Sequence, residues 1–267
     1  MGQPQNSTAE KSEAPSSHAA GQARRISGFD VVRGFSVVSM VLFHLCYDLV
    51  YLAGIDLAFF SGAFQDVWRC SISWAFVFVA GCMSAHSRNN LRRAGKYLAV
   101  ALAIFVATTV VAVDTPINFG VIYCMGACTL VVALLERLGI APRGRVACAL
   151  LAIVFILLLG LPEGKVGLPG MYLTVPAQAY ATPWLSWLGL PGPGFASGDY
   201  YPLLPYLMLY LAGRAAAERG RACGYPTWFA SLTCPPLELV GRHSLLVYVL
   251  HQPVLLGITW LVSGGKI

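Results

Sequence analysis

The stretch VVRGFSVVSMVLFHLCYDLVYLAG, residues 31–54, decides the fold. The hydrocarbon core of a bilayer is about 30 Å thick and takes about 20 helical residues to cross, so this stretch is long enough to span it. Arg33, His44 and Asp48 lie inside it, although an Arg or Asp at the bilayer centre costs about 2.5 to 3.5 kcal/mol on insertion scales. The stretch therefore predicts a membrane helix whose polar groups are compensated.

Further apolar runs follow in a chain of 267 residues, of which 57% are hydrophobic and 11% charged. Soluble domains carry about 25% charged residues, so this composition excludes an ordinary soluble globule. We expect an all-α integral membrane protein, a polytopic bundle of about seven transmembrane helices of the length that a bilayer requires. The expected spans are residues 31–54, 67–85, 97–113, 119–138, 146–161, 201–217 and 244–262.

The basic residues alternate in density from one connecting segment to the next. Of the 18 Lys and Arg residues, 14 fall in segments on one predicted side of the membrane, and such an excess marks the cytoplasmic side. We therefore expect a cytoplasmic N-terminus, an outside C-terminus and a multi-pass protein of the plasma (inner) membrane. No basic block is interleaved with aromatic side chains, so we exclude nucleic acid as a partner.

Two segments stand apart from the spans. Residues 1–23 contain no apolar run, which predicts a disordered cytoplasmic tail. Residues 24–267 are expected to form one transmembrane domain in which 162–200 is a long outer loop, too dense in proline for a membrane helix. The eight cysteines have neither zinc-ligand spacing nor a secreted disulfide pattern, and we expect no metal and no permanently bound cofactor.

One face of the first span carries a polar stripe. At about 100° per residue, Asp30, Arg33, His44, Asp48 and Tyr51 fall within about 60° of one another. His44 and Asp48 are four residues apart, so we expect the carboxylate to contact and orient the imidazole. The alternative is that Asp30 with Arg33, and His44 with Asp48, merely neutralise each other and hold the bundle together.

A second set of polar residues is expected in the last span and on the outer side. Tyr248 and His251 have helical spacing in the last span, where a His is as often a packing residue as a functional one. Asp114, Asn118 and Asp199 add polar groups on the outer side. Asp199 also has a simpler interpretation, as the N-cap of the sixth helix.

Four stretches occur in a fixed order: RISGFDVVRGFSVVSMVLFHLCYDL (25–49), INFGVIYCMG (117–126), SGDYYPLLPYL (197–207) and VGRHSLLVYVLHQP (240–253). Together they resemble the bacterial branch related to the catalytic domain of heparan-α-glucosaminide N-acetyltransferase. The resemblance implies a polytopic acyltransferase. Such an enzyme takes an acyl group, in the first place acetyl, from acyl-CoA on the cytoplasmic side and passes it to a sugar or glycan acceptor on the far side.

The resemblance also implies roles for individual residues. His44 matches the histidine near the end of the first helix that acts in transfer, and we expect it to be a general base or a transient acyl carrier, oriented by Asp48. The mammalian enzymes carry their proposed active His in the loop after this helix, where this chain has none. The residues expected to bind acyl-CoA are Arg33, Arg88, Arg92, Arg93 and Arg242, and those expected on the acceptor side are Asp199, His251, Tyr248, Asp114 and Asn118.

Two other functions compete with acyl transfer. A secondary transporter or proton-coupled carrier would use His44 and Asp48 as an intramembrane relay. A haem protein would use His44 and His251 as axial ligands, but their expected heights differ by about 8 Å along the membrane normal, which disfavours shared ligation. The sequence leaves open the acceptor, the acyl chain and the oligomeric state.

Overall fold

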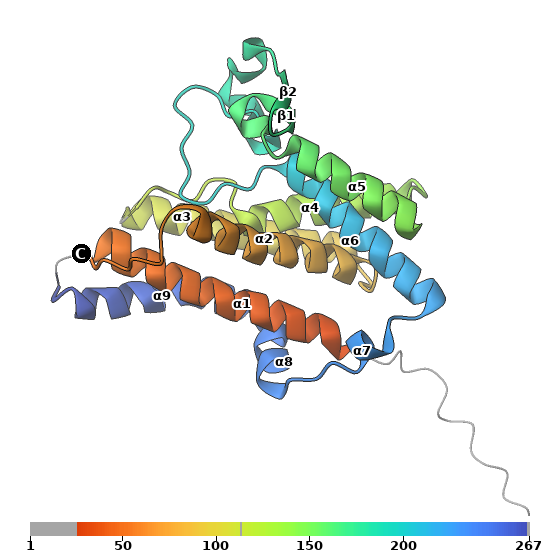
Figure 1. Ribbon diagram of the computed structural model, residues 1–267, viewed down its shortest axis with the longest axis horizontal. Coiled ribbons are helices and arrows are strands. Elements are labelled where there is room, and N and C mark those ends of the chain that lie inside the picture. The colour runs from red at the N-terminus through yellow and green to blue at the C-terminus, as the bar shows by residue number, and fades with distance from the viewer. Residues whose placement is uncertain (1–25, 113, 266–267) are drawn as a thin grey trace, which may run out of the picture.

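The computed structural model describes residues 26–112 and 114–265, so the predicted tail at 1–23 lies outside the described residues. The described chain is dominated by long helices (Figure 1). They are α1 (Ser27–Tyr47), α2 (Gly62–Ser84), α3 (Asn90–Val111), α4 (Val121–Arg137), α5 (Gly144–Leu158), α6 (Leu203–Cys223) and α9 (Ser244–Val262), with two short helices, α7 (Thr227–Ala230) and α8 (Pro235–Arg242), before the last.

Five stretches of the described chain are helical, long and apolar enough to cross a membrane. They are Ser27–Leu52, Gly62–Ser84, Asn90–Val111, Gly144–Glu163 and Ser244–Val262. The other two expected spans correspond to α4, which has 17 residues, and to α6, which carries several charged residues in its second half. The structure therefore supports an all-α membrane protein, while the count of seven crossings and the direction of the termini stay predictions.

Helix α6 lies at the centre of the packing, against α5, α2 and α4. Glycines allow its backbone to approach α2 closely. A Cβ atom on Gly81 would lie 2.0 Å from the Tyr210 carbonyl oxygen, and one on Gly213 would lie 2.1 Å from the Phe78 carbonyl oxygen. Small residues at such positions are the usual device by which membrane helices pack.

Helix α8 is held in the same way against the first half of α1, as Figure 1 shows. A Cβ on Gly241 would lie 2.0 Å from the Asp30 carbonyl oxygen, and one on Gly34 would lie 1.9 Å from the Leu237 carbonyl oxygen. This contact fixes the height at which α9 begins beside α1. It therefore determines which residues of the two helices meet.

The two ends of the bundle differ in character. One end is called the basic end below. There the start of α3, the end of α4 and the second half of α6 meet through polar contacts. The Asn90 amide nitrogen lies 3.0 Å from the Glu136 carboxylate, and Arg214 lies 2.8 Å from the same group. The helix α1 begins at this end, where His86 lies 2.8 Å from the Tyr225 hydroxyl and both rings contact Phe29.

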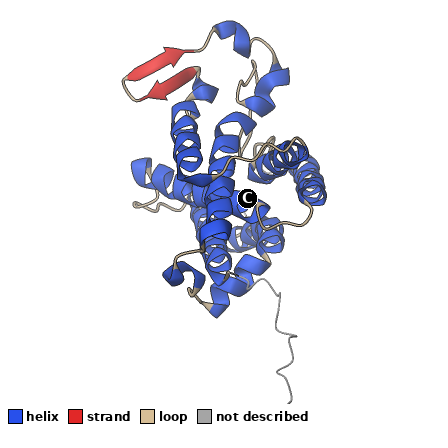
Figure 2. Ribbon diagram, turned by 90° about the vertical axis from the view of Figure 1, so that its right-hand side faces the viewer, coloured by secondary structure: helices blue, strands red, loops and turns tan. Residues whose placement is uncertain are grey.

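The opposite end, called the hairpin end, contains the segment 162–200. It forms no long helix. Instead, strands β1 (Lys165–Leu168) and β2 (Met171–Thr174) pair antiparallel, with Lys165 opposite Thr174, and project beyond the helices (Figure 2). Short 3-10 helices surround them, at Leu161–Glu163, Ala177–Tyr180 and Pro183–Leu188. The small hairpin is the one departure from an all-α fold in the described residues.

Candidate functional site

The polar part of α1 ends in an unusual turn. Residues Asp48–Leu52 form a π-helix directly after α1, and the Ala53 amide donates to the Asp48 carbonyl at 3.0 Å. Such widened turns occur frequently at functional sites. The Asp48 side chain at its start is fully buried.

The imidazole rings of His44 and His251 are neighbours. Their centroids lie 5.0 Å apart with an interplanar angle of 58°. The expectation that the two residues differ in height by about 8 Å is therefore wrong. The close packing of α8 against α1 determines where α9 begins, and it brings His251 beside His44. The argument that used this height difference against shared ligation falls with it.

Asp48 does not contact His44 as the four-residue spacing predicted. Both of its carboxylate oxygens accept from the Gln252 amide nitrogen, at 3.1 Å each. The backbone of Asp48 is still α-helical, since its amide donates to the His44 carbonyl, so the side-chain partner on α9, and not the backbone angle, accounts for the difference. Asp48 thus ties α1 to α9 one residue away from His251.

The contacts of His251 define its tautomer. Its Nδ1 lies 2.5 Å from the Tyr248 carbonyl oxygen, which can only accept a hydrogen bond. Nδ1 therefore carries the hydrogen, and in the neutral ring Nε2 holds a lone pair. Nε2 is buried without a hydrogen-bond partner among the described residues. Neither ring nitrogen of His44 has such a partner there either, so both imidazoles retain free acceptor capacity.

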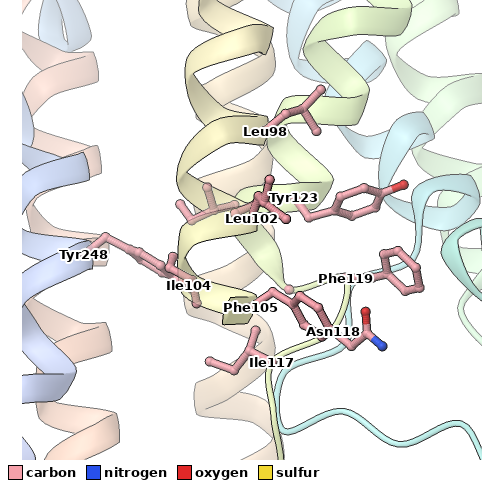
Figure 3. Close-up of a pocket in the computed structure, with 12 residues that line it drawn as sticks. Leu98, Leu102, Ile104, Phe105, Ile117, Asn118, Phe119, Tyr123 and Tyr248 are labelled. Atoms are coloured by element: carbon pink, nitrogen blue, oxygen red, sulfur yellow. The ribbon is translucent and has the colours of Figure 1, made fainter. Parts of the chain in front are cut away.

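A cavity of about 350 Å³ is lined in part by Tyr248, although neither histidine lines it (Figure 3). Tyr248 of α9 forms part of its wall, and the side chain points toward Ile104 of α3. Tyr248 and His251 are also in ring contact, with centroids 5.4 Å apart. The remaining lining comes from α3, the segment 117–120 and the first turn of α4: Leu98, Ala101, Leu102, Phe105, Ile117, Asn118, Phe119, Gly120, Ile122 and Tyr123.

A polar network closes the hairpin-end margin of the cavity. The Ser197 hydroxyl donates to the backbone carbonyl of Asn118 at 2.7 Å and accepts from the backbone N–H of Asn118 at 2.9 Å. Asp199 accepts from the backbone amide of Val121 at 3.1 Å. Asp199 therefore caps α4, not the sixth helix as expected, whose own N-cap is Pro202.

The Asp199 carboxyl has a perturbed acidity. Burial raises its pKa from the ordinary value of 3.8 to about 6, although the Val121 amide and the Arg69 guanidinium both oppose the rise. A carboxyl with this pKa changes its protonation near neutral pH, which makes the segment at the start of α4 sensitive to pH.

Asp114, another expected acceptor-side residue, is near the end of α1. It lies within electrostatic range of Tyr47 and Asp48. The structure therefore brings the expected acceptor-side residues into two groups. Asn118 and Tyr248 line the cavity, with Asp199 beside Gly120 at its margin and His251 in ring contact with Tyr248. Asp114 lies with Asp48 instead.

At the basic end, Arg33 and Arg93 meet across a small cavity that Ser244 and Tyr97 also line. Arg33 is paired with the Asp30 carboxylate and donates to the Gly241 carbonyl at 2.6 Å. Of the two pairs in the alternative interpretation of the polar stripe, Asp30 with Arg33 is therefore formed. Arg93 lies over the Tyr97 ring at 5.4 Å. Among the described residues, no carboxylate lies within ion-pair distance of Arg93.

The other arginines expected to bind acyl-CoA lie outside this cavity. Arg88 and Arg92 are exposed, and the Arg92 backbone amide is used in capping α3, where it donates to Asn89 at 2.8 Å. Arg242 pairs with Glu238 at 2.8 Å and approaches Asp30 at 3.9 Å. Only Arg242 of these three lies near Arg33.

Sequence reasoning passed over several residues of the site. Gln252 was given no role, and its contact with Asp48 joins two helices that are distant in the chain. Ser197 and Tyr97 belong to no motif or spacing that would indicate a role in the site. Arg69, a charged residue inside an expected span, was likewise given no role, although it lies within electrostatic range of Asp199.

One comparison with known protein families covers nearly all of the described helices. The family model described as "Heparan-alpha-glucosaminide N-acetyltransferase, catalytic" matches residues 25–253. The matched range contains His44, Asp48 and His251, together with the arginines of the basic end. The searches of curated proteins and of solved structures gave no match.

Proposed function

The chain belongs to the family of heparan-α-glucosaminide N-acetyltransferase catalytic domains, and on this premise we propose that it moves an acetyl group from acetyl-CoA to a sugar or glycan acceptor. The family is one of membrane acetyltransferases. The donor, the acceptor side and the roles of single residues are our proposal, as is the inner membrane as its location. The observation that carries it is the contact between His44 and His251, at 5.0 Å.

The donor enters at the basic end in this proposal. Arg33 and Arg93 face one small cavity together with the Ser244 side chain. Guanidinium groups bind phosphates through several parallel hydrogen bonds, and CoA carries phosphates on the part of the molecule remote from its thioester. Arg33 is held in place by Asp30 and by the Gly241 carbonyl, so its position does not depend on the ligand.

The transfer step is a proton transfer coupled to acyl transfer. His44 removes the proton from an acceptor hydroxyl or amine, whose oxygen or nitrogen attacks the thioester carbonyl. The new acyl bond forms, the carbon–sulfur bond breaks, and the proton passes from the imidazolium to the leaving thiolate. General base catalysis of this kind contributes about 10² to 10⁴-fold in rate. In the alternative route an imidazole nitrogen accepts the acyl group first and then passes it to the acceptor.

His251 and Asp48 support this chemistry in different ways. The lone pair on His251 Nε2 is buried without a protein partner and belongs to the ring that faces His44, so it can accept a hydrogen bond from the protonated partner. Asp48 holds α9 through Gln252 and acts as a positioning residue. A site between apolar helices also keeps water from hydrolysing the thioester.

A proton-coupled carrier is the second candidate. The buried carboxylate of Asp48 beside Asp114 favours it, since acidic groups inside membranes often form proton relays. Membership in a transferase family favours acyl transfer instead. The two candidates differ in what they require: a carrier moves its substrate in the absence of acyl-CoA, whereas a transferase releases CoA only with an acceptor.

The test supplies acetyl-CoA labelled in the acetyl group to purified protein in lipid nanodiscs, with amino sugars and envelope glycans as acceptors. Release of the CoA thiol that depends on the acceptor, together with label in the sugar product, is the expected result. Counterflow of sugar in sealed vesicles without acyl-CoA, with no thiol release from any acceptor, would overturn the proposal in favour of the carrier.

A further inference from the structure

The cavity beside Tyr248 has more in common with a lipid site than with a sugar site. Its walls are apolar along α3, where Leu98, Leu102 and Phe105 line it. The cavity is open, and its rim is exposed: Leu102 is 63% exposed. Because α3 and α9 are both long and apolar enough to cross a membrane, the open side faces hydrocarbon and not water.

The few polar groups of the cavity are unpaired in the protein. Neither the Tyr248 hydroxyl nor the Asn118 side-chain amide has a hydrogen-bond partner among the described residues. A ligand pocket is typically apolar with a small number of polar groups that fix the orientation of the ligand. At about 350 Å³, this cavity lies near the lower end of the range for such pockets, about 300 to 1,000 Å³.

The polar and apolar parts lie at different heights. Helix α3 begins at the basic end and ends at the hairpin end, so Leu98 lies nearer the basic end and the segment 117–120 follows at the hairpin end. Asn118 and the Asp199 network are therefore at the hairpin-end margin. The part of the apolar wall that contains Leu98 and Leu102 lies toward the basic end, above Asn118 in Figure 3. An amphipathic molecule fits with its head at the hairpin end and its chain toward the bilayer middle.

We propose that this cavity binds the hydrocarbon chain of a lipid-linked acceptor, whose sugar head lies at Asn118 and Tyr248. This inference rests on the proposed acyl transfer and names the class of acceptor. A membrane lipid with this orientation belongs to the leaflet at the hairpin end, whereas the chain of a long acyl-CoA would enter from the arginines at the basic end. Tyr248 connects the cavity to the histidines, because it lines the cavity and its ring contacts that of His251.

In the reaction, a hydroxyl or amine of the lipid-linked sugar loses its proton to His44 and attacks the thioester carbonyl. The acyl–oxygen or acyl–nitrogen bond forms, the carbon–sulfur bond breaks, and the proton leaves on the CoA thiol. The lipid chain takes no part in the chemistry. It delivers the head to the histidines and raises its local concentration in the plane of the membrane.

The experiment compares two acceptors that share a head and differ in the chain: methyl β-D-glucosaminide and octyl β-D-glucosaminide, with acetyl-CoA as donor, in nanodiscs. We expect the KM of the octyl acceptor to be at least tenfold lower. Ala101→Phe fills the lined side of α3 and should bring the ratio of the two KM values close to one. Ala103→Phe makes the same change at an exposed position of the same helix that does not line the cavity, and should keep the ratio.

The control separates binding in the cavity from simple partitioning of the octyl acceptor into lipid, which both variants leave unchanged. Equal KM values in the unmodified protein, or a ratio that survives Ala101→Phe, would overturn the inference. So would a chain-length preference that appears for octanoyl-CoA over acetyl-CoA, disappears in Ala101→Phe, and leaves the two acceptors equivalent, because the cavity would then serve the donor.

A binding measurement keeps the inference testable if Ala101→Phe does not fold or if no acceptor is acylated. Octyl glucosaminide with a diazirine in its alkyl chain is photolysed with the unmodified protein, and the labelled peptides are mapped. Labelling within α3 and the first turns of α4, displaced by excess octyl glucosaminide, supports the lipid site even if the proposed transfer fails. Labelling spread evenly over all exposed helix faces would overturn the lipid site and leave the proposed transfer untouched.

Discussion

The rings of His44 and His251 lie 5.0 Å apart, although one residue is in the first long helix and the other in the last. No short-range pattern produces this contact. It depends on α8, whose Gly241 packs against the Asp30 carbonyl and so sets the height of α9 beside α1. A change that disturbs the α1–α8 contact should therefore also displace His251 relative to His44.

The α1–α8 contact predicts the effect of adding one methyl group. In Gly241→Ala the new Cβ would lie 2.0 Å from the Asp30 carbonyl oxygen, so the helices must separate, which typically costs about 1 to 3 kcal/mol. We expect a lower Tm and a loss of transfer activity that exceeds the loss of folded protein. Gly257→Ala is the matched control, because nothing lies within 4 Å of its added Cβ; equal Tm values for the two variants would contradict the prediction.

The Asp48–Gln252 contact predicts a pattern of rescue. Asp48→Leu leaves the Gln252 amide unpaired, and the loss of a partner for a buried polar group costs about 1 to 3 kcal/mol. We expect kcat to fall at least tenfold with little change in the KM of acetyl-CoA, and Asp48→Asn, which keeps an acceptor oxygen, to restore most of it. The double variant Asp48→Leu with Gln252→Leu should be no worse than either single one. Additive losses would show that the two side chains act separately.

The basic end predicts a difference between two neighbouring arginines. Arg93 lines the cavity with Arg33, whereas Arg92 is exposed. Arg93→Gln removes a charged donor, worth about 1.5 to 3 kcal/mol when it binds an anion, so the KM of acetyl-CoA should rise roughly tenfold or more. Arg92→Gln should change it less than twofold. The steady-state KM of acetyl-CoA at fixed acceptor is the measurement, and equal effects of the two changes would place the donor elsewhere.

The Asp199 carboxyl predicts a pH dependence of stability. Its pKa in the folded protein is raised by burial to about 6, above the ordinary value of 3.8. A raised pKa means that the folded state binds the proton more tightly, so the stability from this group is fully present below about pH 4 and is lost as the pH rises through 6. Thermal unfolding between pH 4 and 8 should therefore show a flatter profile in Asp199→Asn than in the unmodified protein.

The control for this profile is Asp56→Asn, since Asp56 is an exposed carboxylate with no ion-pair partner among the described residues. Its profile should follow that of the unmodified protein, because an exposed carboxylate keeps its water on folding. Profiles of Asp199→Asn and unmodified protein that run parallel over the whole pH range would show that Asp199 ionises with an ordinary pKa.

The sequence predicted what depends on local pattern. The long apolar runs identified the helices, because the length of a run is read directly from the chain. The pairing of Asp30 with Arg33 follows from three-residue spacing on one helix and is confirmed. The same local rule failed for His44 and Asp48, because the Asp48 carboxylate accepts from Gln252 of the distant helix α9 instead.

Contacts between distant segments were beyond prediction from one sequence. The height of α9 depends on glycines that let α8 contact α1. Nothing in the sequence around either glycine indicates which segment it contacts. Asp199 looked like the cap of the helix that follows it, yet it caps α4, which precedes it by many residues. The cavity at Tyr248 likewise arises from α3, α4 and α9 together.

The most direct test of the account is the rate of acceptor-dependent CoA release by His44→Gln in nanodiscs, measured beside His86→Gln. His86 is exposed at the basic end and pairs with Tyr225, so its replacement controls for the loss of an imidazole elsewhere. The account predicts that His44→Gln loses about 10² to 10⁴-fold in kcat while it binds acetyl-CoA and melts like the unmodified protein, and that His86→Gln retains its rate. A folded His44→Gln protein that releases CoA at the unmodified rate would contradict the account.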